Sequence, residues 1–248
     1  MTQHSGRREP LFNLPGPVVA ACAVLIGVHL LRLVLTPEQD LEILARFAFV
    51  PDRLQAVAER QYLYPGGSWA DAASFVSYAL LHADIFHLGV NLSFFAAFGA
   101  VIVRRFGTVR FVLLCLVSAI GAAMAHWAAH VGEATPVIGA SGIVSGLMGA
   151  LARFGFEPGG PMRVGGLGAR GADALAAARV PAPGLTASLT DGRVLQFVAV
   201  FLVMNLVIVF GAEALTGPGG GIAWEAHVGG FMTGFLAFSL LDPVDPRG

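Results

Sequence analysis

One serine, two histidines and one asparagine lie in apolar or glycine-rich surroundings where polar side chains are uncommon. Ser141 lies in the segment GASG, His227 lies in AHVGG, and His87 precedes Asn91 by four residues in an apolar stretch. Serine is a weak nucleophile that needs a neighbouring base, and a neutral imidazole can take its proton. Side chains such as His87 and Asn91 can donate hydrogen bonds to a developing oxyanion. If the fold brings these groups together, they predict nucleophilic attack by Ser141 with His227 as the base.

The composition indicates that these residues are carried by an integral membrane protein. The chain has 248 residues, of which 56% are hydrophobic and 12% charged, and its mean hydropathy is +0.72. Soluble domains contain about 25% charged residues, so this chain has too few to cover a soluble surface. A disordered chain, a nucleic-acid module, a coiled coil and a disulfide scaffold are excluded as the main class. The net charge of −1 gives no indication of a nucleic-acid partner.

The hydropathy pattern predicts an all-α polytopic membrane protein with six spans, because a helix needs about 20 apolar residues to cross a bilayer. The predicted spans are 18–35, 83–103, 111–130, 136–153, 194–211 and 222–241. They define a membrane domain over 18–241, between an N-terminal tail (1–17) and a C-terminal tail (242–248). Two connections are long. Residues 36–82 form a first outer loop with interfacial aromatic residues, and 154–193, rich in Gly, Ala, Pro and Arg, form a flexible cytoplasmic insertion.

The arginine distribution predicts the orientation of the spans. With the N-terminus in the cytoplasm, eleven arginines fall on the inner side and three on the outer side. Positive charge concentrates on the cytoplasmic side of membrane proteins. We therefore expect both termini to be cytoplasmic.

This topology places the four polar residues at a common depth. Spans two, four and six all run from outside to inside. His87, Ser141 and His227 lie about five residues below the starts of their spans and Asn91 about nine, which corresponds to roughly 6–14 Å at 1.5 Å per residue. Polar groups inside membrane spans are costly and are candidates for function. The shared layer therefore predicts one site near the outer face.

Small residues predict close packing of the two helices that carry Ser141 and His227. Gly142 and Gly146 follow the serine, and Gly230 and Gly234 share the face of the histidine. Small faces allow membrane helices to approach closely. No acidic residue lies at helical spacing on the His227 face, so we expect a serine–histidine dyad without a carboxylate.

Taken in order, these motifs resemble the rhomboid family of intramembrane serine proteases, in their six-helix bacterial form. The family pattern places a histidine and an asparagine on one helix, then GxSG, then AHxxGxxxG in the last span. The residues that carry the resemblance are His87, Asn91, Gly139, Ala140, Ser141, Gly142, Ala226, His227, Gly230 and Gly234. The resemblance covers about residues 18–241 and implies a six-helix rhomboid-like bundle.

The resemblance also implies an activity: cleavage of transmembrane segments of other membrane proteins near the outer face. Ser141 would be the nucleophile and His227 the general base, while His87, Asn91 and the backbone N–H of Ser141 would form the oxyanion hole. Residues 194–211 would form a lateral gate for substrate. The implied partners are transmembrane protein substrates and the lipid bilayer, with no metal or other cofactor, in the bacterial inner membrane. The oligomeric state stays open.

Two positions depart from the family pattern. Many bacterial members carry a tyrosine four residues after the nucleophile, where it stacks on the catalytic histidine, but this chain has Ser145. The imidazole must therefore be held in another way. The first outer loop contains Ser68-Trp69-Ala70 in place of the Trp-Arg pair that is common in the family.

Other interpretations of these residues were open at the level of sequence. His87 and Asn91 also suit an interhelical hydrogen-bonding pair, and Asn205 is expected to make an interhelical bond. His126 and His130 have a spacing that suits metal binding, but no third ligand accompanies them in sequence, so interfacial histidines are the preferred reading. A catalytically inactive relative that binds client helices is the alternative function. A small transporter is disfavoured because no acidic residue lies at mid-depth.

Overall fold

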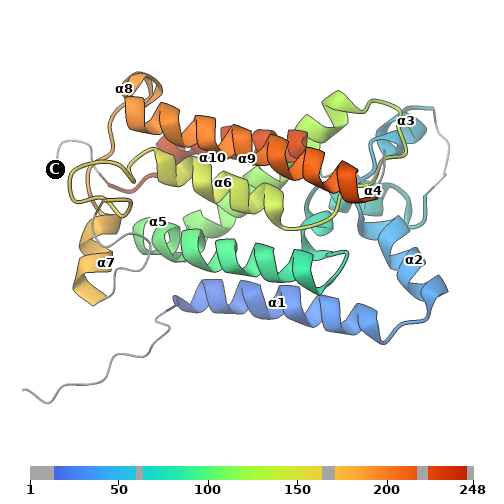
Figure 1. The fold of residues 1–248 in the computed structure, drawn as a ribbon. Coiled ribbons are helices and arrows are strands. Elements are labelled where there is room, and N and C mark those ends of the chain that lie inside the picture. Colours follow the sequence, from blue (N-terminus) through green and yellow to red (C-terminus); the bar gives the residue numbers. More distant parts are fainter. Residues whose placement is uncertain (1–13, 60–63, 164–170, 217–222, 245–248) are drawn as a thin grey trace, which may run out of the picture.

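The computed structural model describes residues 14–59, 64–163, 171–216 and 223–244, and this part of the chain is helical (Figure 1). Parts of both predicted tails, of the predicted insertion and of the start of the sixth predicted span lie outside the described residues. Within the described residues no β-sheet forms, and one isolated bridge joins Phe49 to Val137. The helices are α1 (Gly16–Leu33), α2 (Pro37–Phe47), α3 (Asp52–Ala58), α4 (Gly67–Ser77), the short 3-10 helix η1 (Tyr78–Leu80), α5 (Ile85–Ala129), α6 (Ser141–Ala152), α7 (Gly171–Ala178), α8 (Leu185–Thr190), α9 (Gly192–Thr216) and α10 (Trp224–Leu241).

Helix α5 is two helical halves joined at Gly107, and it covers the second and third predicted spans. Gly107 has φ 71° and ψ 174°, a backbone conformation that glycine adopts without the strain of a Cβ atom. The chain turns back there, since the Phe111 ring packs against Phe95 with the ring centroids 6.0 Å apart. The two halves therefore lie against each other, and both contribute to the same core.

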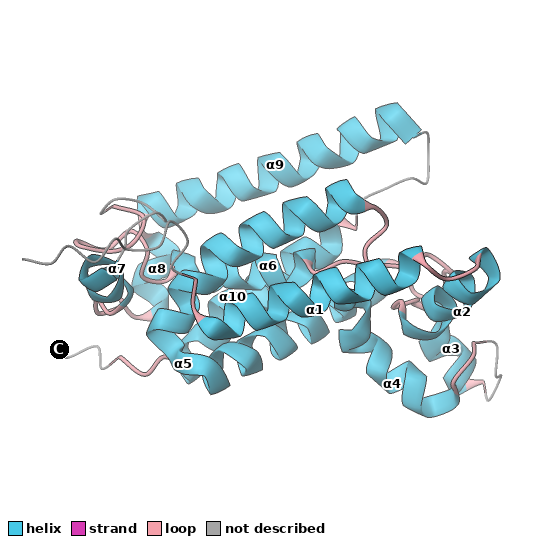
Figure 2. Ribbon diagram, turned by 90° about the horizontal axis from the view of Figure 1, so that it is seen from below, coloured by secondary structure: helices cyan, strands magenta, loops and turns pink. Residues whose placement is uncertain are grey.

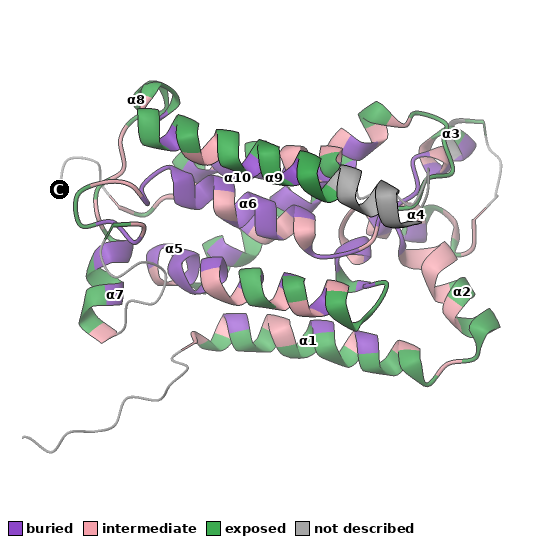
Figure 3. Cartoon of the chain, in the orientation of Figure 1, coloured by how far each residue is buried: buried purple, intermediate pink, exposed green. Residues whose placement is uncertain are grey.

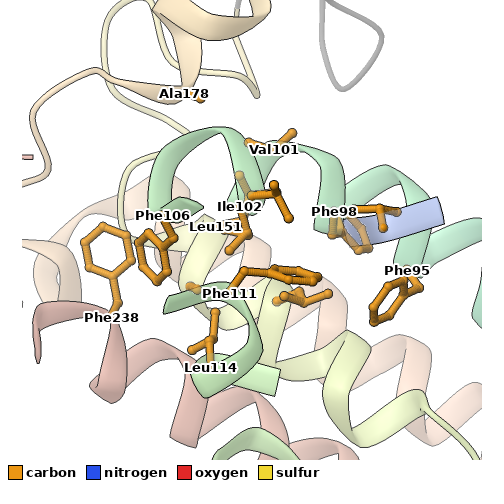
Figure 4. Close-up of a cluster of buried hydrophobic side chains, with 14 of the residues drawn as sticks. Phe95, Phe98, Val101, Ile102, Phe106, Phe111, Leu114, Leu151, Ala178 and Phe238 are labelled. Carbon is orange, nitrogen blue, oxygen red and sulfur yellow. The ribbon is translucent and has the colours of Figure 1, made fainter. Parts of the chain in front are cut away.

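The core lies where α5, α6 and α10 meet. Helix α6 is the most enclosed of the long elements, with nine of its twelve residues buried (Figure 3). Aromatic and aliphatic side chains from both halves of α5 pack with Leu151 of α6 and Phe238 of α10 (Figure 4). Since α6 carries Ser141 at its first residue, this enclosed helix positions the candidate nucleophile.

Shorter helices gather at the two ends of the bundle. Helices α2, α3 and α4 lie at the end where α6 and α10 begin, and α7 and α8 lie at the opposite end (Figures 1 and 2). The described parts of 154–193, the predicted flexible insertion, contain α7 and α8 and contact the bundle. Ala178 of α7 belongs to the main core. Two buried arginines hold this segment against the bundle. Arg105 donates hydrogen bonds to the carbonyls of Ala178 and Val180, and Arg153 donates one to the hydroxyl of Ser188.

The outer faces of the long helices are apolar. Helix α1 exposes Leu30, Leu31 and Leu33, and α9 exposes a row of aliphatic side chains that includes Val203 and Val207. By length and composition α1 and α5 could each cross a membrane, and Ser141–Ala152 and Gly192–Ile208 are shorter apolar helices. A soluble monomer rarely exposes apolar surface on this scale. These exposed apolar faces suit contact with lipid.

Candidate active site

Ser141 and His227, which are 86 residues apart in sequence, form a hydrogen bond. The Ser141 Oγ lies 2.8 Å from Nε2 of His227. Ser141 is the first residue of α6, and His227 lies in the first turn of α10. The distance is within the range for a nucleophile and its general base. The predicted approach of these two side chains is therefore present in the structure.

The second ring nitrogen of His227 is held by Asn205 of α9. Nδ1 lies 2.6 Å from Asn205 Oδ1, and the Nδ2 group of Asn205 donates to the carbonyl of Phe201 at 2.8 Å. Because the amide nitrogen is used by that carbonyl, Oδ1 is the atom that faces the ring, and an oxygen there can only accept. Nδ1 must therefore carry the proton, which leaves a lone pair on Nε2 for the hydroxyl of Ser141.

The sequence predicts an interhelical bond for Asn205, but it does not reveal that the partner is His227. The imidazole of His227 is therefore restrained by Asn205, since Ser145 stands where many family members have a stacking tyrosine. Ser145 itself is buried. Both ring nitrogens of His227 are engaged by neutral side chains, so the site is a Ser–His–Asn arrangement.

Close packing of α6 on α10 makes the serine–histidine contact possible. A Cβ atom at Gly230 would overlap the carbonyl of Gly142, and one at Gly234 would overlap the carbonyl of Gly146. A Cβ at Gly149 would likewise meet the carbonyl of Phe231. At these three levels the helices meet backbone to backbone, which only glycine allows.

The turn before Ser141 is shaped by Gly139 and packed against His87. Gly139 has φ 113°, and its N–H donates to the carbonyl of Tyr78 at 3.0 Å. A Cβ at this position would lie 2.6 Å from Nε2 of His87, so the imidazole rests directly on the glycine. His82 adds a contact to the same turn, because its Nε2 accepts from the N–H of Ala140 at 3.4 Å. The two histidine rings lie edge to face, with centroids 5.0 Å apart.

The proposed oxyanion donors His87 and Asn91 both lie near the start of α5. His87 is in the first turn of α5, where its N–H donates to Asp84 Oδ1 at 2.8 Å. Asn91 is buried, and its Nδ2 donates to the carbonyl of His87 at 2.9 Å. Its second amide hydrogen is left for another acceptor. The N–H groups of the first turn of α6 have no intrahelical acceptor, and they favour negative charge near Ser141.

The family comparison agrees with this geometry. Residues 69–167 match the family model of the Rhomboid domain, a segment that includes most of α4 and all of α5 and α6, and therefore His87, Asn91 and Ser141. Asn205 and His227 lie beyond the matched segment. A search of curated proteins finds no match. The motifs, the helical fold and the domain match point the same way: residues 69–167 are similar to the Rhomboid domain, which occurs in integral membrane proteins.

Proposed function

We propose that this protein is an intramembrane serine endopeptidase that cleaves transmembrane segments of other membrane proteins near the outer face. The observation that carries the proposal is the 2.8 Å contact between Ser141 Oγ and His227 Nε2, with Nδ1 held by Asn205. A serine used only for helix packing does not require an imidazole in this tautomer.

The proposed reaction begins when His227 Nε2 takes the proton of Ser141 Oγ as the oxygen attacks the scissile carbonyl. The tetrahedral oxyanion accepts hydrogen bonds from the backbone N–H of Ser141, from His87 and from Asn91. When the intermediate collapses, the proton on Nε2 passes to the leaving amine. Water then repeats the sequence on the acyl-enzyme, with the same base and the same donors.

The proposed topology has six spans, with the two halves of α5 counted separately and both termini in the cytoplasm. Helix α9 is the proposed lateral gate. It lies along one edge of the bundle in Figure 2 and packs through Phe201 against Phe231 of α10, with ring centroids 4.6 Å apart. Over residues 192–208, its remaining faces are largely exposed. A helix held on one side can move away and admit a substrate helix.

Two assays test the proposal, and both use the full chain purified in detergent. A fluorophosphonate probe should label the wild type, and Ser141→Ala and His227→Ala should abolish both labelling and cleavage of a transmembrane substrate. Ser145→Ala is the matched control, because it removes a hydroxyl one turn further along α6 and should keep labelling.

The competing function is that of an inactive rhomboid relative that binds client helices. A folded wild type that captures transmembrane segments but neither reacts with the probe nor cleaves them would support this alternative. Cleavage that survives Ser141→Ala would contradict the assigned nucleophile.

A further inference from the structure

We propose that His126, His130 and Glu225 form a binding site for a divalent transition metal, with Zn²⁺ the metal that best suits the ligand set. Metal binding at His126 and His130 is disfavoured by the sequence alone, because no third ligand accompanies them there. The fold supplies that ligand, since Glu225, at the start of α10, comes beside the end of α5 where the two histidines lie. The site is separate from the bonds that join Ser141, His227 and Asn205.

The three donor atoms are close enough to share one ion. They all lie within 4.8 Å of one another, and His130 Nε2 is 3.4 Å from Glu225 Oε1. Ligands about 2.0–2.1 Å from a tetrahedral Zn²⁺ are separated by about 3.3 Å. One pair already has this separation, and rotation of side chains would close the others.

Hydrogen bonds already orient both imidazoles as they are oriented in metal sites. His126 Nε2 bonds the carbonyl of Thr135 at 3.1 Å, and His130 Nδ1 bonds Glu133 Oε2 at 2.9 Å. Metal-ligating histidines almost always give their second N–H to a carbonyl or a carboxylate in this way. The other nitrogen of each ring, Nδ1 of His126 and Nε2 of His130, is then left with a lone pair for a metal.

The unused nitrogen of His126 is the second observation that points to a ligand. His126 is 1% exposed, and its Nδ1 is buried without a hydrogen-bond partner among the described residues. A buried polar atom without a partner costs free energy. The same nitrogen bound to a metal would be satisfied. His130 and Glu225 are partly exposed, so an ion can reach the site from the surface.

The ligand chemistry restricts the metal. Two imidazoles with one carboxylate suit Zn²⁺ and its neighbours Co²⁺ and Ni²⁺, whereas Mg²⁺ and Ca²⁺ prefer sites made of oxygen ligands. Three protein ligands leave a fourth position for water. A bound ion would join the end of α5 to the start of α10, two residues before His227.

The metal-free alternative is a protonated His130 that bridges Glu133 and Glu225. This ion pair explains His130 but leaves Nδ1 of His126 without a partner. The two arrangements differ in metal content, which does not depend on proteolytic activity.

In the test, the full chain in detergent is dialysed against Zn²⁺ as the only added metal. Elemental analysis then measures the Zn²⁺ that is bound. We expect one equivalent of Zn²⁺, a higher melting temperature with Zn²⁺ than without it, and a four-coordinate absorption spectrum with Co²⁺. His126→Ala, His130→Ala and Glu225→Gln should each weaken Zn²⁺ binding at least about tenfold. His29→Ala is the matched control, because His29 of α1 is also buried with an unpartnered Nδ1, and it should bind Zn²⁺ like the wild type.

If removal of His126 impairs folding, a second variant still tests the proposal. Glu133 is exposed, and Glu133→Gln should weaken Zn²⁺ binding through His130 by about 10- to 100-fold without disturbing the core. Absence of a bound equivalent in the folded wild type, or equal affinity in wild type and all ligand variants, would overturn the proposal.

Discussion

At the scale of single residues, the unusual feature of this site is that a neutral amide holds the imidazole. An aspartate in place of Asn205 would put an ionised carboxylate among apolar helices, where an incompletely paired charge is costly. The amide orients the ring and accepts from Nδ1 without bringing a charge. It stabilises the protonated ring less than a carboxylate would, so orientation is its main contribution.

Loss of the amide should therefore lower the rate of the proposed reaction. A hydrogen bond to a group that becomes charged contributes about 1.5–3 kcal/mol, so Asn205→Ala should lower kcat about 10- to 150-fold. KM is measured alongside kcat, because the same bond joins α9, the proposed gate, to α10. The measurement is steady-state cleavage of a transmembrane substrate. Asn205→Asp, which keeps an oxygen acceptor, should retain more activity than Asn205→Ala.

Met204→Ala is the control for an effect on α9 itself. Met204 is the preceding residue and is half exposed on the helix surface, so its loss should leave kcat unchanged. If Asn205→Ala and Met204→Ala had equal effects, or if Asn205→Ala slowed a variant that already lacks His227, a role through the imidazole would be wrong.

His82 should make the structure sensitive to acid. Burial, followed by the positive charge that His87 can carry, lowers the pKa of His82 from 6.5 to about 4. Between these values the unfolded chain binds a proton that the folded chain does not bind, so the free energy of unfolding falls as pH drops from about 6.5 toward about 4. A proton on Nε2 would also face the N–H of Ala140 in the turn before Ser141.

Melting temperatures measured across this pH range in wild type and in His82→Gln would check this prediction. The wild type should lose more stability on acidification than the variant, which keeps an acceptor and does not titrate. If the melting temperatures of wild type and His82→Gln fell in parallel with pH, His82 would not be the cause of the acid sensitivity.

The sequence identified four residues of the candidate site, while the role of Asn205 required the structure. The depth argument that grouped Ser141 and His227 applies to Asn205 as well. It lies six residues before Gly211, the predicted outer end of its span, which is about 9 Å. Depth alone does not tell which neighbouring helix a side chain faces, so the bond to His227 depends on packing that one sequence does not contain.

At the scale of elements, glycines on α6 and α10 set the distance between nucleophile and base. Gly230→Ala would push a methyl group into the carbonyl of Gly142. Overpacking of this kind costs about 1–3 kcal/mol, so the melting temperature should fall. Fluorophosphonate labelling of Ser141 should slow even below the melting temperature, because His227 moves with α10.

Gly27→Ala provides the matched glycine control. Gly27 lies in α1, and a Cβ there meets nothing within 4 Å. Alanine is the better helix former by about 1 kcal/mol, so this variant should be as stable as the wild type or more stable. If Gly230→Ala labelled as fast as Gly27→Ala, the α6–α10 distance would not limit the reaction.

The elements themselves were predicted unevenly. Thr36 caps α2 with Gln39 in a reciprocal capping box, a signal that is present in the sequence, yet 36–82 was predicted only as a loop. The predicted end of the second span before Arg104 reflects the cost of charge in a membrane. Helix α5 nevertheless continues to Gly107, because Arg105 finds a carboxylate partner 137 residues away.

At the scale of the whole molecule, buried arginines bind the elements together at the end opposite the candidate site. Arg105 makes a bidentate pair with Asp242, with Nε and Nη2 each 2.8 Å from a carboxylate oxygen. Its guanidinium group also lies over the rings of Phe154 and Phe238. One side chain thus connects α5, the end of α7 with the segment that follows it, and the residue that follows α10. Through α10 it supports the helix that carries His227.

Arg105→Ala should therefore destabilise the fold more than it affects the chemistry. It would leave the carboxylate of Asp242, whose side chain is only 11% exposed, without its partner, and removal of one member of a buried pair costs about 3–5 kcal/mol. Arg105→Lys should fall between wild type and Arg105→Ala, because an ammonium group cannot make the bidentate pair and reach both carbonyls. Arg110→Ala is the control, since Arg110 is exposed, and it should change stability by less than about 0.5 kcal/mol.

Thermal unfolding in detergent measures the series, and fluorophosphonate labelling well below the melting temperature should be unchanged in all three variants. If Arg105→Ala had the same melting temperature as the wild type, the arginine would not hold this end of the bundle together. If it melted normally but labelled slowly, Arg105 would instead act on the catalytic end through α10.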